Sequence, residues 1–422
     1  MSSAKEELFE NWPMMVVAFV LVFFAFGVPT FSLAFMYGPA MHEFGWTNAE
    51  VNLLSTSKFL IGGAAALCMG LVIDKVGGRW TVLVGTAVGG LAMALFLFAT
   101  NLPVYYLAGA LLGFSASSIV AAMQVVVARL FSANQGIAMG VVLTATSFGG
   151  VVMPQVWPPL LQVMNWRHIF LLLSIGPLVI AVPLWLIFMA HNRRMREIVS
   201  APTLVRRDRS IWQHFRFISR EPGFWLIALG VFLVSGVDQA LTQNYVNFLR
   251  FDKGMDLNTT IKWAGTLFAV IGVLAKVFSG WFYDRFSIRG IAYFYLLLAA
   301  SVWLGLPVVG VSSMLVFIIM RGLAHGGMIV DAPILTRHYF GMERIGMTIG
   351  IMSVAVNLGF AAGPPIFGWL ADIYGNFSVG MIFFGAAAAV ATLSLWWIKP
   401  RYWTPPADQA ALAARAGVVA GQ

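Results

Sequence analysis

The sequence predicts an all-α integral membrane protein with twelve transmembrane helices, arranged as two six-helix pseudo-repeats. Three observations predict this fold class. About 60% of the 422 residues are hydrophobic and only 10% are charged, whereas a soluble domain carries roughly 25% charged residues. Twelve apolar runs are long enough to cross a bilayer, which takes roughly 20 residues each. One sequence pattern also recurs at a constant offset in the two halves of the chain.

The apolar runs are bounded by charged residues, proline or glycine, and they form two groups of six. Because lipid offers no hydrogen-bond partners to the backbone and the runs lack the alternation of a β-barrel, each is predicted to be a helix. The first group is predicted at 13–38, 49–73, 80–100, 103–129, 136–163 and 168–190. The second group is predicted at 223–249, 259–283, 290–309, 313–337, 345–371 and 377–398.

This pattern predicts four parts of the chain: an N-terminal six-helix bundle (1–190), a basic cytoplasmic linker (191–222), a C-terminal six-helix bundle (223–398) and a cytoplasmic tail (399–422). The linker holds eight arginines against three acidic residues. Cationic residues collect on cytoplasmic loops, so the simpler interpretation is a loop held on that side. The alternative is an amphipathic segment that lies on anionic lipid.

The distribution of positive charge predicts the topology. With the N-terminus inside, the inner segments hold 19 of the 26 Lys and Arg residues. The outer segments hold only Arg167, Arg250, Lys253 and Lys262. By the positive-inside rule, both termini are expected in the cytoplasm. The protein is expected in the cell's inner (plasma) membrane as a multi-pass protein. The same rule explains the net charge of +9 without nucleic-acid binding.

The two halves of the sequence are related by an offset of 210 residues. The pattern that recurs is Gly70-x-x-x-Asp74-Lys75-x-x-x-Arg79, which returns as Gly280-x-x-x-Asp284-Arg285-x-x-x-Arg289. The same offset relates Gly149 to Gly359 and Pro154 to Pro364. Parallel repeats with a substrate site between them near the bilayer midplane are a known transporter plan.

The loop GLVIDKVGGRW resembles the signature loop of the major facilitator superfamily, with Lys75 and Gly78 where arginine is usual. The second copy, GWFYDRFSIRG, has Ser287 in place of the loop glycine. The resemblance implies that family's fold and a gating loop made of Gly70, Asp74, Lys75, Arg79, Gly280, Asp284 and Arg285. A carboxylate beside basic residues can clip the two bundles together and release them; the alternative is a carboxylate that only caps a helix.

A finer resemblance is to the monocarboxylate and oxalate–formate branch of that superfamily. It is carried by FGVPTFSLAFMYGPAMHEFGWTNAEV and by the run from RLFSANQG to NWRHIF. In that branch a cationic residue of span eight, four residues before the loop glycine, holds the substrate carboxylate. That position is Lys276 here. Lysine keeps the charge of the usual arginine but lacks its planar two-pronged donor.

Five ionisable residues lie deep in the predicted spans: Lys58, Asp238, Lys276, Arg321 and Asp331. Each costs roughly 2.5–3.5 kcal/mol at a helix centre, and the position 210 residues away is uncharged in every case. Their depths predict two ion pairs, Asp238 with Arg321 and Lys276 with Asp331. Lys58 is then the excess cation that suits an anionic substrate. For each residue the alternative is a structural role between helices.

The expected substrate-binding residues are Lys276, Arg321, Lys58, Asn357 and Gln243, and the expected proton-coupling residues are Asp238, Asp331 and His325. The predicted function is secondary active transport of small organic anions, chiefly monocarboxylates, as proton symport by alternating access. The alternatives are organic anion exchange without protons and export of metabolites or drugs. We expect the functional unit to be a monomer whose partners are the anion, a proton and membrane lipid.

An enzyme is not expected, because the sequence offers no nucleophile–base set. The single cysteine, Cys68, and the scattered histidines form no metal-binding motif. ATP-driven transport is also not expected, because the phosphate-binding loop G-x-x-x-x-G-K-[ST] is absent from the sequence. We therefore expect neither a metal nor a cofactor.

Overall fold

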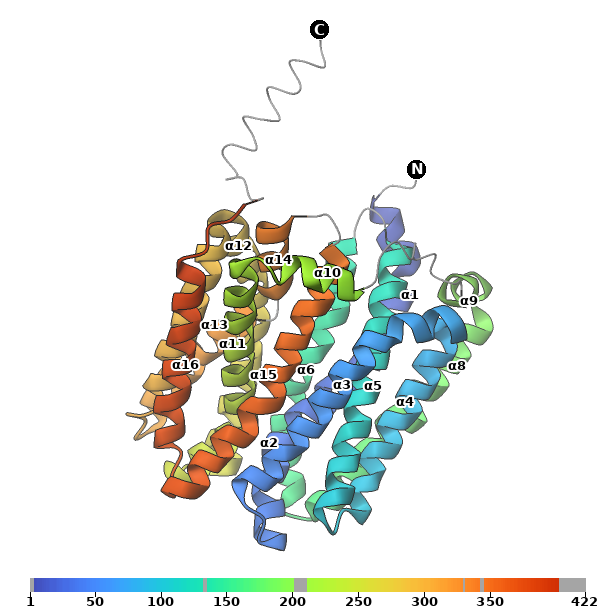
Figure 1. Ribbon diagram of the computed structural model, residues 1–422. Coiled ribbons are helices and arrows are strands. Elements are labelled where there is room, and N and C mark those ends of the chain that lie inside the picture. Colours follow the sequence, from blue (N-terminus) through green and yellow to red (C-terminus); the bar gives the residue numbers. More distant parts are fainter. Residues whose placement is uncertain (1–3, 132–134, 201–210, 329–330, 342–344, 402–422) are drawn as a thin grey trace.

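The computed structural model of this chain describes residues 4–131, 135–200, 211–328, 331–341 and 345–401. Within these ranges every regular element is a helix. The side chains of Asp74, Lys75 and Asp284 lie outside the description. Helix α1 begins and helix α16 ends at the same end of the molecule, which we call the terminal end (Figure 1). The other end is called the opposite end.

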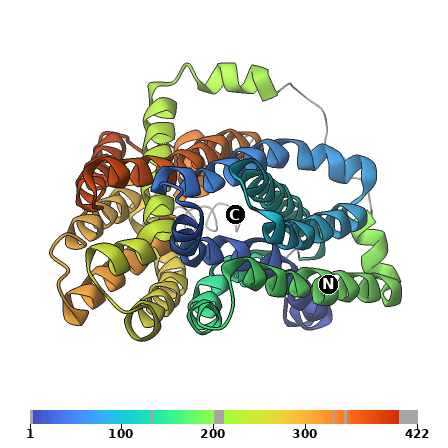
Figure 2. The ribbon, with the colours of Figure 1, turned by 90° about the horizontal axis from the view of Figure 1, so that it is seen from below.

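The helices form two groups, one coloured blue to green and the other yellow to red, which lie beside each other (Figure 2). We call them the first and second halves. The first half contains α1 (Ala4–Val22), η1 (Phe23–Gly27), α2 (Val28–Phe44), α3 (Asn48–Val76), α4 (Gly78–Leu95), η2 (Phe96–Phe98), α5 (Leu102–Leu130), α6 (Gln135–Leu161), α7 (Trp166–Ile175), η3 (Gly176–Ala181) and α8 (Val182–His191).

Two short helices, α9 (Arg193–Ser200) and α10 (Ile211–Ile218), follow at the terminal end (Figure 1). The second half contains α11 (Pro222–Asn247), η4 (Phe248–Asp252), η5 (Leu257–Ile261), α12 (Lys262–Leu304), α13 (Val311–Met328), α14 (Asp331–Phe340), α15 (Ile345–Tyr374) and α16 (Ser378–Trp396). The segments η1, η3, η4 and η5 are π-helical turns that continue or precede an α-helix.

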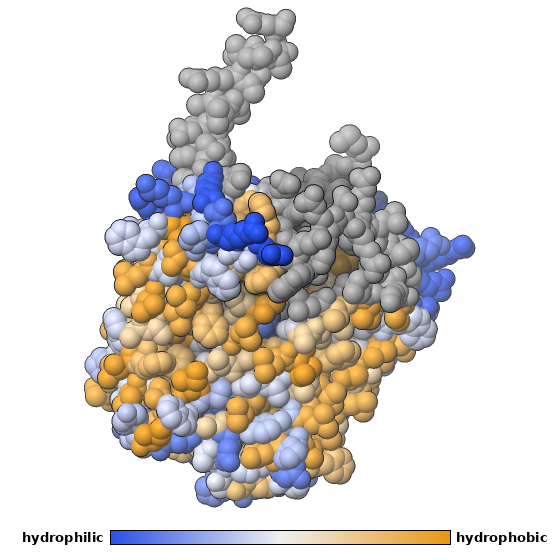
Figure 3. All heavy atoms as spheres, viewed as in Figure 1, coloured by the Kyte–Doolittle hydropathy of each residue, from blue (hydrophilic) through white to orange (hydrophobic). Residues whose placement is uncertain are grey.

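Eleven segments of the described chain are long and apolar enough to cross a membrane. They correspond to eleven of the twelve predicted spans. The remaining predicted span, 49–73, is α3, whose 29 residues make a helix about 43 Å long. Hydrophobic residues form a broad belt around the visible face, between hydrophilic rims at the two ends (Figure 3). This is the surface expected of a protein whose sides face lipid.

The predicted boundary between the runs 259–283 and 290–309 is a kink within one long helix. These two runs are the separate spans Lys262–Tyr283 and Arg285–Leu304, with a kink in α12 at Ser287, where φ is 56°. The run predicted at 313–337 is covered by α13 and α14, with residues 329–330 outside the description. Asp331 lies at the start of the described part of α14.

Helix caps account for several of the helix ends. Thr47 and Glu50 form a capping box at the start of α3, in which the Thr47 hydroxyl accepts from the Glu50 N–H and the Glu50 carboxylate accepts from the Thr47 N–H. Asn101 accepts from the N–H of Val104 at the start of α5. Gly45 ends α2 with a φ of 68°, a left-handed conformation that glycine adopts without strain.

Glycines set the closest helix contacts in both halves. A Cβ atom at Gly149 of α6 would collide with the backbone of Gly27. A Cβ atom at Gly359 of α15, the repeat partner of Gly149, would collide with the backbone of Phe232 on α11. Small residues let membrane helices approach until their backbones touch. The duplicated glycines therefore mark the same packing contact in the two halves.

Candidate functional site

The first cluster of buried charges lies inside the second half, between α11 and α13. A guanidinium nitrogen of Arg321 lies 2.7 Å from the Asp238 carboxylate, and both side chains are almost fully buried. The same nitrogen donates to the backbone carbonyl of Asp238 at 2.7 Å and to the hydroxyl of Thr242 at 3.2 Å. The predicted pairing of Asp238 with Arg321 is therefore present.

His325 completes this cluster. Its Nδ1 atom lies 2.9 and 3.0 Å from the two carboxylate oxygens of Asp238. The ring of Phe268 packs against the imidazole, with centroids 4.9 Å apart, and lies 5.3 Å from the Arg321 guanidinium carbon. Asp238 thus meets two basic side chains, while the Nη1 atom of Arg321 is buried and makes no hydrogen bond within the described residues.

Lys58 of α3 is buried in the first half and is held differently. Its Nζ atom donates to the Thr30 hydroxyl at 2.6 Å, and the rings of Phe26 and Phe59 lie 5.3 and 5.1 Å from it. None of the ion pairs found among the described residues involves Lys58. Among the described residues, the Lys58 amine therefore has a hydroxyl and two aromatic faces as partners and no carboxylate.

Gln243 of α11 reaches the same point from the second half. Its Nε2 atom donates to the backbone carbonyl of Thr30 at 3.2 Å. Its Oε1 atom is buried and accepts no hydrogen bond within the described residues. Thr30 therefore joins the two predicted substrate-binding residues Lys58 and Gln243, one from each half.

A cavity of about 240 Å³ lies beside Lys58. Its lining includes Ser117 and Gln124 of α5 and Asn357 of α15. The Nδ2 atom of Asn357 donates to the carbonyl of Ser353, one turn earlier in the same helix. The structure thus brings a further predicted substrate-binding residue, Asn357, to the cavity beside Lys58, which both halves form.

Lys276 of α12 crosses between the halves, because its Nζ atom donates to the Ser147 hydroxyl of α6. The predicted pairing of Lys276 with Asp331 was wrong. Asp331 accepts instead from the Tyr295 hydroxyl at 2.6 Å and from the N–H of Ala332 at 2.5 Å. Similar depth in the membrane does not make two side chains face each other.

The two halves are joined from the middle of the molecule to the opposite end. Asn52 of α3 and Asn244 of α11 exchange hydrogen bonds of 3.0 and 2.9 Å. Further hydrogen bonds between the halves join Thr56 to the Ala361 carbonyl, Gln155 to Thr266 and Asp372 to the first residues of α3. This set separates the buried lysines from the opposite end.

The predicted gating loop is only partly described. Gly70 lies in α3 and Gly280 in α12, but the side chains of Asp74, Lys75 and Asp284 lie outside the description. The Arg79 guanidinium packs on the Trp80 ring at 5.4 Å, and the Arg79 carbonyl accepts from Trp185 at 3.0 Å. Arg285 is exposed. The latch itself stays a prediction.

Several partners of the buried charges were missed in the sequence. Thr30 and Tyr295 carry no recognisable motif, and only their contacts single them out. The contact of His325 with Asp238 had a signal, because Arg321 and His325 are four residues apart and such residues share a helix face. If Arg321 reaches Asp238, His325 can reach it too.

The sequence matches the Major Facilitator Superfamily over residues 15–261 and 254–420. Monocarboxylate transporter 11 of Homo sapiens is 24% identical over 396 residues, which cover 89% of this chain and 80% of that protein. Monocarboxylate transporter 12 of Mus musculus is 20% identical over 350 residues, which cover 75% of this chain and 71% of that protein.

The fold is similar to that of a bacterial homologue of the human lysosomal transporter Spinster, solved in an inward-facing and occupied conformation. The TM-score is 0.73 at 13% identity, and the match covers 92% of this chain and 96% of the other. At this identity the likeness concerns the fold alone. With the family match over nearly the whole chain, the duplicated helices and the charges buried among them, the chain belongs to the Major Facilitator Superfamily and is a secondary transporter, not an enzyme.

Proposed function

We propose that the chain transports small organic anions, chiefly monocarboxylates, together with protons by alternating access. The observation that carries this proposal is the state of Lys58 and Lys276, whose hydrogen bonds go to the hydroxyls of Thr30 and Ser147. Neither lysine forms an ion pair within the described residues. A buried charge costs roughly 2.5–3.5 kcal/mol at the centre of a membrane helix. An anionic substrate would offset that cost each time it binds.

In this proposal the substrate carboxylate binds Lys58 in the cavity that Asn357 also lines. Gln243 donates to the Thr30 carbonyl of the other half, so this hydrogen bond would change when the two halves move relative to each other. Lys276, which lies between the halves on Ser147, supplies the second positive charge. A site built from both halves is what alternating access requires, because the substrate must be released when the halves rock.

The proton is proposed to act at the cluster of Asp238, Arg321 and His325. Arg321 is neutralised by Asp238 as long as that carboxylate is ionised. A proton accepted by Asp238, with His325 as its relay, would release the Arg321 charge to a substrate carboxylate. Asp331, held by Tyr295, is the second candidate carrier. Proton and anion would then bind in the same state and cross the membrane in the same direction, as symport requires.

The names of the relatives support the substrate class, because the human and mouse proteins are called monocarboxylate transporters. The charge distribution supports a cytoplasmic terminal end, by the positive-inside rule. The opposite end would then face outside, and the hydrogen bonds that join the halves there would belong to an inward-facing state.

Anion exchange without protons is the second candidate. It is favoured by the full engagement of Asp238, which already meets both Arg321 and His325. If that cluster never opens, Lys58 and Lys276 alone would bind the anion. The charge would then be balanced by a second anion that travels in the other direction.

Purified protein in proteoliposomes tests these alternatives. Radiolabelled lactate and benzoate are offered in counterflow, with and without an imposed pH gradient, and protein-free liposomes correct for diffusion of the acids. Saturable uptake stimulated by the gradient supports symport, and saturable counterflow indifferent to the gradient supports exchange. Saturable uptake of organic cations, with no acid carried, would overturn the anion proposal.

A further inference from the structure

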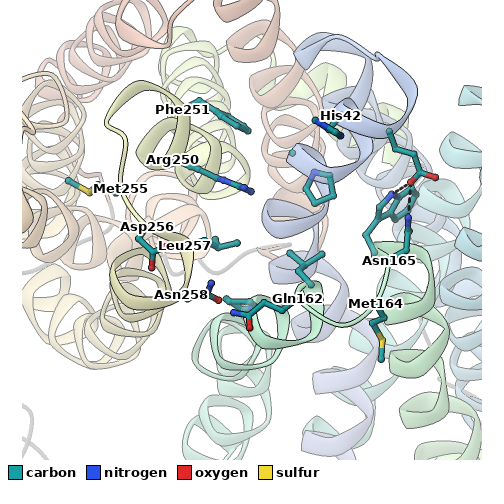
Figure 4. Close-up of a pocket in the computed structure, with 16 residues that line it drawn as sticks. His42, Gln162, Met164, Asn165, Arg250, Phe251, Met255, Asp256, Leu257 and Asn258 are labelled. Atoms are coloured by element: carbon teal, nitrogen blue, oxygen red, sulfur yellow. Dashed lines mark hydrogen bonds between the residues drawn. The ribbon is translucent and has the colours of Figure 1, made fainter.

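A second cavity, of about 670 Å³, lies between the two halves at the opposite end. Its walls come from α2 and the segment joining α6 to α7 in the first half, and from η4, η5 and the loop between them in the second half. Figure 4 shows polar side chains facing this space from both sides. We call this cavity the vestibule.

The positive charge of the vestibule is concentrated at Arg250. Its side chain extends from η4 into the space, with His42 across it on α2 (Figure 4). Arg250 is exposed, its guanidinium carbon lies 5.6 Å from the Phe251 ring, and it forms no ion pair within the described residues. Asp256 also lines the vestibule, but no ion pair joins it to Arg250 in the described part of the chain.

The other carboxylate of the vestibule is already engaged. Glu43 forms a salt bridge with Arg167 and accepts from the Trp166 indole at 2.8 Å and from the Asn165 amide at 3.1 Å. Amide groups line the rest of the polar wall, Gln162 from the first half and Asn258 from the second. A free guanidinium beside amides is a donor set that suits a carboxylate.

The vestibule is separated from the buried lysines. The amide of Gln155 donates to the Thr266 hydroxyl at 2.6 Å and links α6 to α12 between the two regions. Gly38, in the vestibule wall, packs against the side chains of Asn247 and Phe251, so α2 meets the second half closely there. These contacts would separate a ligand bound in the vestibule from Lys58 and Lys276.

We propose that the vestibule is a carboxylate-binding site, in which Arg250 captures the organic anion before the halves open toward it. The identity of the ligand rests on the proposed function; the affinity for anions does not. Of the four cations at this end, Arg167 is paired with Glu43 and Lys253 donates to the Leu306 carbonyl. Lys262 packs over Trp263, outside the vestibule lining. This leaves Arg250 as the cation that faces the space.

The first test measures the local preference for anions without transport. In a Cys68→Ser background, Gln162→Cys places one thiol in the vestibule. Its reaction rates with a sulfonate-bearing and with a trimethylammonium-bearing methanethiosulfonate are compared at low salt. Arg250→Gln should lower the anionic-to-cationic rate ratio about 5-fold, and salt should suppress the difference. Lys262→Gln, the matched control, should change the ratio less than 2-fold.

Benzoate should slow the reaction of the Gln162→Cys thiol when Arg250 is present, and it should not slow the reaction when Arg250→Gln is added. An unchanged rate ratio in Arg250→Gln, or equal protection by benzoate in both proteins, would overturn the vestibule proposal. The second test measures lactate transport with substrate added at each face. Arg250→Gln should raise the KM for lactate about 5-fold when substrate is added at the opposite end and leave it unchanged when substrate is added at the terminal end. An Arg250→Gln protein whose KM changes by the same factor at both faces, or at neither, would overturn the proposal. A protein that keeps the rate-ratio effect but carries no organic anion would refute the proposed function and leave the vestibule standing.

Discussion

Asp372 of α15 accepts hydrogen bonds of 2.8 Å from both the backbone N–H and the side-chain amide of Asn48, the first residue of α3. It also accepts from the N–H of Ala49 at 2.8 Å. A carboxylate at a helix N-terminus is stabilised by the helix dipole and by the free N–H groups. Because the carboxylate and the helix belong to different halves, the contact stabilises the closed arrangement of the opposite end.

Asp372→Ala is therefore expected to favour opening of the opposite end. Loss of a helix cap costs about 1 kcal/mol, which corresponds to roughly a 5-fold change in the population of the open form. In a Cys68→Ser background, a Val246→Cys thiol, buried in the present state, should react about 5-fold faster from that side. Glu50→Ala is the matched control, because Glu50 caps the same helix from within the first half. It should lower the melting temperature without exposing Val246→Cys, and equal exposure in both variants would contradict the interpretation.

Removal of Lys58 and removal of Arg321 should affect stability in opposite directions. Lys58→Met removes a buried amine that has no carboxylate partner among the described residues, so the melting temperature in detergent should stay the same or rise while anion transport falls at least 100-fold. Arg321→Met leaves the buried Asp238 carboxylate with His325 as its one remaining basic neighbour among the described residues, and breaking a buried ion pair costs about 3–5 kcal/mol. Thermal unfolding and lactate counterflow on the same preparations measure both effects. A Lys58→Met protein that unfolds at much lower temperature would assign Lys58 a structural role.

The ion pair of Asp238 with Arg321 can be measured by a double-mutant cycle. Asp238→Asn and Arg321→Gln each leave one buried charge without its partner, whereas the double variant has neither charge. We expect the double variant to recover at least about 1 kcal/mol of the summed loss, because contacting residues are not additive. Asp331→Asn combined with Arg321→Gln is the control, and its effects should add because Asp331 contacts Tyr295 instead. Additive effects in the first pair would mean that the contact contributes nothing to stability.

The positions of the helices could be predicted from the sequence, but the directions in which their side chains point could not. Apolar runs located the spans, and depth along each span correctly paired Asp238 with Arg321. The same argument failed for Lys276 and Asp331, because depth fixes the height of a side chain and not the side of the helix on which it lies. Thr30 became significant only when helix packing placed it against Lys58. Arg250 counted in the sequence only as an outer charge, and only the arrangement of the two halves gives it a cavity.

The contact between Ser147 and Lys276 yields the last prediction. Among the described residues, the Ser147 hydroxyl is the hydrogen-bond acceptor of the Lys276 ammonium in this state. A substrate carboxylate that takes over this N–H must displace the hydroxyl. A hydrogen bond of this kind contributes about 0.5–1.5 kcal/mol. Ser147→Ala should therefore lower the KM for the anion by about 2- to 10-fold, and Ser147→Thr, which keeps the hydroxyl, should change it little. Initial rates of lactate counterflow at several concentrations provide the measurement. If Ser147 binds the substrate directly, Ser147→Ala would instead raise the KM, and the hydroxyl would then belong to the anion site as a ligand and not as a competitor.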